Sequence, residues 1–88
     1  MTAVHLTRVD LAQNLKRFYR LDVQPDLFGG WSFIREWGRI GNPGTVRIAS
    51  FDTVSEAEAA RDRQWHAKEQ RGYTDSDADA QLSLTRSP

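Results

Sequence analysis

Arginine and aromatic side chains alternate along residues 31–40, and this segment carries the strongest signal for binding another molecule. If the segment is a strand, one of its faces carries the odd-numbered residues Trp31, Phe33, Arg35, Trp37 and Arg39. A buried face does not normally hold two arginines, because each guanidinium needs a partner or a path to water. We therefore expect burial near Trp31 and Phe33 and exposure near Trp37 and Arg39. An exposed indole beside a guanidinium suits a sugar or base next to a phosphate.

Other patterns that could support chemistry are weak. His5 and His66 are the only histidines, and neither has neighbours at a metal-ligating spacing. The absence of cysteine excludes a thiol nucleophile and a cysteine–zinc site. Gly41 and Gly44 could clamp a nucleic-acid backbone, but a turn between two strands accounts for them better. We therefore predict no catalytic residue, no metal, no cofactor and no small-molecule substrate, in a protein that is not an enzyme.

The elements that position this face are predicted from apolar spacing and from turn residues. Four segments have the patterning of strands, namely residues 4–9, 17–24, 31–40 and 45–51. The turn at residues 41–44 joins the last two strands into a hairpin. Ser55 and Glu58 form a predicted capping box, and Gly72 is placed to end the helix that follows. The predicted fold class is α+β, an antiparallel sheet with one main helix packed on a face.

Composition indicates one small domain with a polar tail. The chain has 88 residues, with twelve acidic and twelve basic side chains. Residues 1–51 hold seven basic and four acidic groups, whereas residues 52–88 hold five basic and eight acidic groups. We predict a folded domain over residues 1–73 and an acidic tail over residues 74–88. No apolar run approaches the roughly 20 residues of a membrane span, so we expect a cytoplasmic protein with no membrane partner.

The predicted tail has two features of its own. Asp75, Asp77 and Asp79 alternate along it, and Leu82 and Leu84 have strand spacing. The leucines could dock on a sheet edge or on a second copy of the chain, which leaves self-association open.

The region around residues 37–44 resembles the signature of the WGR domain, with Trp37-Gly38-Arg39, then Ile40-Gly41 and Gly44. The resemblance covers roughly residues 5–73 and includes a basic and aromatic run before the motif and a helix after it. WGR domains occur in DNA-damage-activated poly(ADP-ribose) polymerases, in molybdate-regulator-like bacterial proteins and as small stand-alone bacterial proteins. In the polymerases the domain binds DNA at a break, through the tryptophan and arginine of the motif.

The resemblance implies a non-enzymatic nucleic-acid-binding module that recognises DNA ends or nicks. Trp37 would lie against a terminal sugar and Arg39 would contact a phosphate. Lys16 matches a polar DNA-contacting position before the aromatic pair. With the nearby basic groups, the predicted nucleic-acid-binding residues are Lys16, Arg35, Trp37, Gly38, Arg39 and Arg47. The same surface meets neighbouring protein domains in the polymerases, so a protein–protein interaction module is the alternative.

Overall fold

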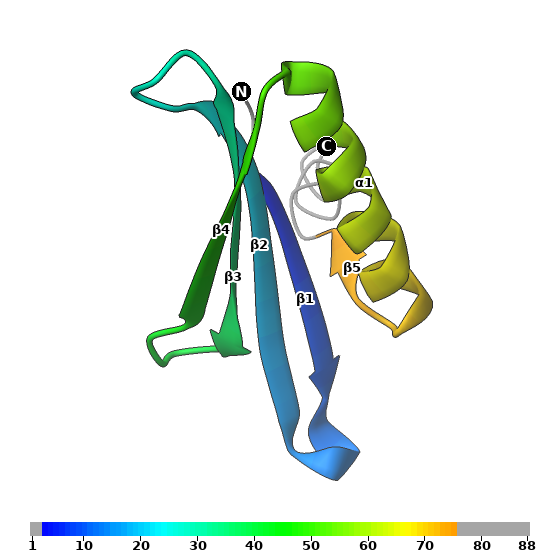
Figure 1. The fold of residues 1–88 in the computed structure, drawn as a ribbon. Helices are drawn as coiled ribbons and strands as arrows, with labels where there is room; N and C mark the ends of the chain where they lie inside the picture. The colour runs from blue at the N-terminus through cyan, green and yellow to red at the C-terminus, as the bar shows by residue number, and fades with distance from the viewer. Residues whose placement is uncertain (1–2, 76–88) are drawn as a thin grey trace, which may run out of the picture.

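A computed structural model describes residues 3–75 as one antiparallel sheet with a helix across one face (Figure 1). The strands are ordered β4-β3-β2-β1-β5. Their bounds are Val4–Asp10 for β1, Leu15–Pro25 for β2, Trp31–Arg39 for β3, Thr45–Phe51 for β4 and Thr74–Asp75 for β5. A short 3-10 helix, η1 (Leu11–Gln13), leads from β1 to β2, and α1 (Val54–Gln70) follows β4. The predicted α+β architecture is confirmed.

Strand β5 was not predicted. It brings Thr74 and Asp75 beside Leu6 and Thr7 of β1, so the sheet continues for two residues past residue 73. The rest of the predicted tail, including Asp77, Asp79, Leu82 and Leu84, lies outside the described residues.

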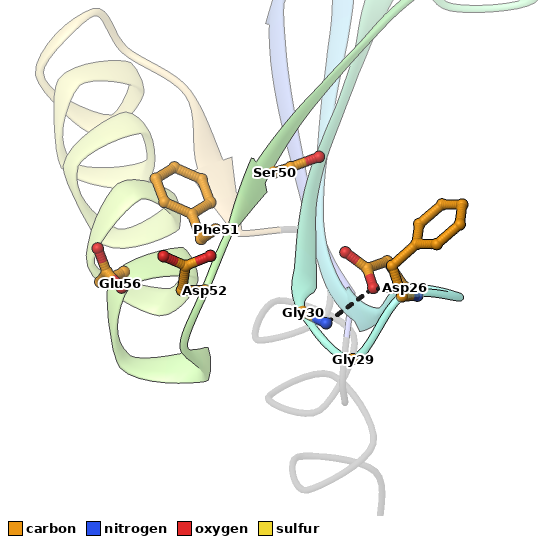
Figure 2. A pocket seen from close by; sticks show the side chains of 8 residues that line it. Asp26, Gly29, Gly30, Ser50, Phe51, Asp52 and Glu56 are labelled. Atoms are coloured by element: carbon orange, nitrogen blue, oxygen red, sulfur yellow. Dashed lines mark hydrogen bonds between the residues drawn. The ribbon is translucent and has the colours of Figure 1, made fainter.

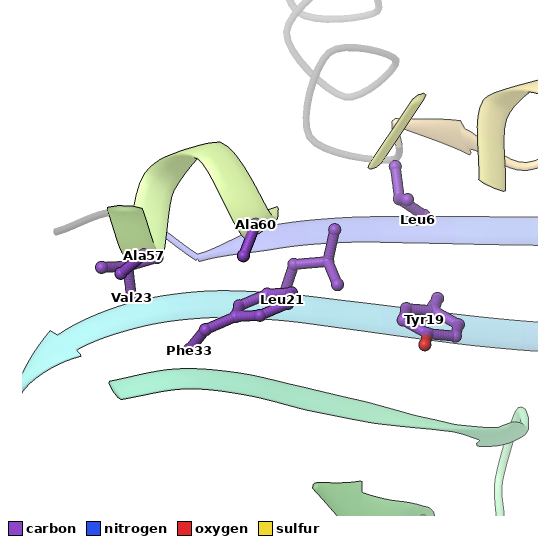
Figure 3. Packing of buried hydrophobic residues seen from close by; sticks show 7 residues of the cluster. All are labelled: Leu6, Tyr19, Leu21, Val23, Phe33, Ala57 and Ala60. Carbon is purple, nitrogen blue, oxygen red and sulfur yellow. The ribbon is translucent and has the colours of Figure 1, made fainter. Parts of the chain in front are cut away.

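Alternation along β2 places the core on the helix side of the sheet. Tyr19, Leu21 and Val23 point to that side, and Tyr19 lies opposite Leu6 on β1. The buried apolar cluster is shown in Figure 3 and consists of Leu6, Tyr19, Leu21, Val23, Phe33, Ala57 and Ala60. Alanine is the helix's contribution to this cluster, and its small side chain lets α1 approach the sheet closely. Phe33 is buried as predicted, whereas Trp31 is half-buried at the margin.

The start of α1 differs from the predicted one. The capping residue is Thr53, whose hydroxyl accepts from the Glu56 amide at 3.2 Å and donates to the Glu56 carboxylate at 3.0 Å. The predicted box at Ser55 and Glu58 is therefore wrong by two residues. The sequence contains both boxes in overlap, and the earlier start packs Val54 against the core. At the other end Gly72 has a φ of +95°, as a helix-terminating glycine requires. Within residues 3–75, no helix is both long and apolar enough to cross a membrane.

Candidate functional site

Three aromatic rings form the floor of the candidate site, at the end of the sheet where α1 finishes. Tyr19 is buried and stacks on Trp37 of β3, with ring centroids 5.5 Å apart and an interplanar angle of 11°. Tyr73 meets Tyr19 edge-on at 6.2 Å. Because Tyr19 belongs to the core and lies directly opposite Trp37, the indole is held in place without a ligand. Trp37 remains half-buried, which confirms its predicted partial exposure.

Arg39 ends β3 two residues beyond Trp37 and is exposed. Its guanidinium donates to the backbone carbonyl and to the side-chain oxygen of Asn14, both at 3.3 Å. Asn14 has a φ of +53° at the corner between η1 and β2, and this left-handed turn aims both acceptors at β3. Since both partners are neutral, the charge of Arg39 is oriented but not compensated.

Glycines let the β3–β4 turn lie close to β2. A Cβ at Gly38 would lie 3.2 Å from the Gly44 Cα, and a Cβ at Gly44 would lie 2.8 Å from the ring of Phe18. These separations are shorter than ordinary carbon contacts, so side chains at the two positions would push the hairpin away from Phe18. Gly38 thus sets the positions of the tryptophan and the arginine on either side of it.

Two hollows that share lining residues open at this end. The first has a volume of about 230 Å³ and is lined by Arg17, Trp37, Gly38, Arg39 and Tyr73. The second, of about 340 Å³, is lined by Arg8, Arg17, Tyr19, Trp37, Lys68, Arg71 and Tyr73. We call the combined surface the cationic–aromatic site. Its five cations form no ion pair with any residue in the described part of the chain.

Three of these cations form a row across the sheet. Arg8 of β1 lies directly opposite Arg17 of β2, and Arg17 lies directly opposite Arg39 of β3. Like charges that face one another across strands destabilise a sheet unless a counter-charge is present. We call this set the arginine row, and a bound anion would relieve its repulsion.

Lys68 adds a fourth cation from the last turns of α1. Its Nζ lies 4.7 Å from the ring centroid of Tyr19 and 5.9 Å from that of Tyr73. Partial burial, and then the positive charges of Arg71 and Arg35, lower the pKa of Lys68 below its ordinary value. Among the described residues, no carboxylate lines either of the two hollows.

The structure brings together part of the predicted set. Trp37, Gly38 and Arg39 line the same hollow, and the Arg35 guanidinium lies 5.7 Å from the centroid of the Trp37 ring. Arg47 lies opposite Arg35 on the edge strand β4 and lines neither hollow. Lys16 is one residue out of phase with Arg17, which places it on the other face of the sheet.

Several lining residues were not in the predicted set: Arg8, Arg17, Tyr19, Lys68, Arg71 and Tyr73. The apolar alternation of β2 could have found Arg17, because Arg17 shares the phase of Tyr19 and Leu21. To predict Arg8, one must know the pairing register of β1 with β2. To predict Lys68 and Arg71, one must know the direction in which α1 crosses the sheet.

The opposite end of the sheet has a hollow of about 350 Å³ between the β2–β3 loop and the start of α1 (Figure 2). Its carboxylates are Asp26, Asp52 and Glu56. Asp26 accepts from the backbone amides of Phe28 and Gly30, both at 2.8 Å, and Glu56 belongs to the helix cap. Within residues 3–75 there is no cluster of His, Asp and Glu that could hold a metal ion. Asp26 and Glu56 therefore stabilise the local backbone, and we do not take this hollow as the candidate site.

The antiparallel sheet, the helix α1 across one of its faces and the Trp-Gly-Arg corner define a small α+β domain. The chain belongs to the WGR domain family, whose model matches residues 2–80. The uncharacterized protein y4dW of Sinorhizobium fredii is 31% identical over 70 residues. The match covers 80% of this chain and 34% of that relative, so the chain spans about a third of the relative's length. No solved structure matches the chain. Membership of this family is consistent with a nucleic-acid-binding module.

Proposed function

We propose that this chain is a non-enzymatic module that binds DNA at ends or nicks through the cationic–aromatic site. The observation that carries the proposal is the arginine row beside a half-exposed, pre-stacked Trp37. Phosphates supply the negative charge that the row lacks, and guanidinium groups bind them through paired hydrogen bonds. A free phosphate would leave the aromatic floor unused, whereas a nucleotide uses both parts of the site.

An end or a nick suits this site better than continuous duplex. In an intact duplex each base and sugar is enclosed by its neighbours along the strand, so an indole finds no free face to stack on. A terminal nucleotide presents such a face beside its own phosphate. Trp37 would stack on that terminal group while Arg39 and Arg17 contact the phosphates.

The direct experiment is a binding titration that compares a nicked or blunt 5′-phosphorylated duplex with a closed circle of the same sequence. We expect the interrupted DNA to bind more tightly. Arg39→Ala should weaken this binding by about 1.5–3 kcal/mol, the range for hydrogen bonds to charged groups, while leaving the fold intact. Arg39→Lys should restore only part of the affinity because the planar fork is lost.

Lys16→Ala is the matched control, because it removes the same charge from the other face of the sheet and should leave affinity nearly unchanged.

A site that neutralises about three phosphates should also give a slope near −2.7 when the logarithm of the binding constant is plotted against the logarithm of the salt concentration. Equal affinity for the nicked and closed DNA, or unfolding of the Arg39→Ala protein, would contradict the proposal.

A further inference from the structure

Strand β4 forms an open edge of the sheet, far from the short β5 at the other edge. Every residue from Thr45 to Ser50 is exposed, and Phe51 is half-buried. The strand contains no proline and pairs with β3 in unbroken register. Edge strands usually carry proline, bulges or a covering segment that prevents pairing with another chain. Among residues 3–75 nothing covers this edge, and Arg47 is its single charge.

A groove lies between β4 and α1. It has a volume of about 290 Å³ and is lined by Phe33, Arg35, Ala49, Phe51, Ala60, Arg63, Gln64 and Ala67. The floor is apolar, while Arg35 and Arg63 supply positive charge and no carboxylate lines the groove. Arg47 projects to the same side of the sheet, because it lies opposite Arg35 in the β3–β4 pairing.

The other side of β4 is apolar and exposed. Val46 and Ile48 have 53% and 64% of their surface exposed, and Ile48 lies opposite Ile34. The edge therefore presents different chemistry on its two sides. One side offers arginines over an apolar floor, and the other offers β-branched side chains.

We propose that β4 pairs with an extended segment of a partner protein in which acidic and β-branched residues alternate. In an added strand, side chains point alternately to the two faces of the sheet, so one set meets the groove and the other meets the open face. Acidic side chains facing α1 would approach Arg35, Arg47 and Arg63. Valine or isoleucine on the other set would pack against Val46 and Ile48.

Two other occupants fit this edge less well. A second copy of the chain paired through β4 would bring two Arg47 side chains onto one face, close to both copies of Arg35, and like charges oppose such pairing. A nucleic-acid backbone offers phosphate acceptors but cannot satisfy the alternating amide and carbonyl groups of a strand edge. The apolar floor and the exposed valine and isoleucine would also gain no contact from phosphates.

The experiment uses the full chain, labelled for amide NMR, and a synthetic peptide of alternating aspartate and valine about as long as β4, which has 7 residues. We expect shifts along Thr45–Phe51 that saturate with peptide, and no change at Tyr73, which lines the cationic–aromatic site but not the groove. Arg47→Ala should weaken binding about three- to tenfold, as expected for one partly exposed charged contact. Arg39→Ala, which removes one charge from the cationic–aromatic site, is the matched control and should bind the peptide like the unmodified protein.

Two peptide controls test the binding mode. Replacing aspartate with lysine should abolish binding by charge repulsion, and methylating the backbone amides should abolish it by removing strand pairing. The proposal would be overturned if either control peptide bound as tightly as the aspartate–valine peptide. It would also be overturned by shifts confined to the cationic–aromatic site, or by no binding at millimolar peptide. Shifts along β4 that arise only with a short oligothymidylate would overturn it in favour of nucleic acid. Because none of these readouts needs DNA bound at Trp37, the two proposals fail independently.

Discussion

The two ends of the sheet carry opposite charge, but they use charge in different ways. At the acidic end, the Asp26 carboxylate accepts two backbone amides and Glu56 caps a helix. At the cationic end, the Arg39 guanidinium donates only to neutral acceptors of Asn14, and its neighbours have no acidic partner in the described residues. Asp26 and Glu56 stabilise a loop and the start of a helix, whereas the cationic groups remain available to bind an anion. A charged group that already has a hydrogen-bond partner within the fold is weak evidence for a ligand. A charged group without a charged partner is stronger evidence for one.

The aromatic side chains at the two ends of the sheet also differ in how firmly the fold holds them. Phe28, at the tip of the β2–β3 loop, is 94% exposed and belongs to no ring pair. Trp37 is stacked on a buried tyrosine and held beside an arginine. A ring that is already ordered loses little conformational freedom on binding, so the fixed indole is the better stacking surface.

Among the changes that compare the two ends, the largest expected effect comes from removing the fixed ring. Trp37→Ala should weaken binding to nicked or blunt DNA by about 1–3 kcal/mol through lost stacking. Phe28→Ala is the matched aromatic control at the acidic end and should change binding by less than about 0.5 kcal/mol. Both are measured by fluorescence anisotropy with labelled DNA, at a temperature where circular dichroism shows each variant to be folded. Equal losses for the two variants would show that the ends do not differ in function.

A smaller effect, on stability rather than binding, is expected at the acidic end. Asp26→Ala removes the acceptor for two loop amides and should lower the free energy of unfolding by roughly 1–2 kcal/mol. Asp26→Asn keeps an oxygen acceptor and should recover most of that loss. Urea denaturation measures the stabilities, and DNA affinity at 25 °C should be the same for all three proteins. Tighter DNA binding by both variants would mean that the acidic end repels DNA at long range.

The fold could be predicted because its signals are local. Tyr19, Leu21 and Val23 alternate with polar residues, and the Gly-Asn-Pro-Gly turn separates two β-rich segments. The helix start was wrong because Thr53 and Ser55 each precede a glutamate by three residues. The earlier start packs the partly buried Val54 against the core, and such packing is a tertiary property that no local pattern contains.

The candidate site could be predicted only in part, because many of its residues come together through the pairing register of neighbouring strands. Trp37 and Arg39 share a face by simple alternation, so the sequence places them together. Arg8 meets Arg17 only because the corner at Asn14 fixes how β1 pairs with β2, and that corner has no glycine or proline to mark it. The predicted Lys16 and the hollow-lining Arg17 differ by one position, and one residue along a strand changes the face.

The smallest expected effect concerns Lys68 and alkaline pH. Burial and the charges of Arg71 and Arg35 lower the pKa of Lys68 in the free protein. A phosphate in the same hollow would favour the protonated amine and raise that pKa, so the complex binds a proton more tightly than the free protein does. DNA affinity should therefore be constant at neutral pH and fall a few-fold as the pH rises through the lowered pKa of Lys68 in the free protein. Lys68→Arg keeps the charge but does not titrate in this range, so it should bind DNA with a flatter pH profile. Tyr19 and Tyr73 face the same amine. A Lys68→Arg profile that matches the unmodified protein would show that the amine does not meet the phosphate.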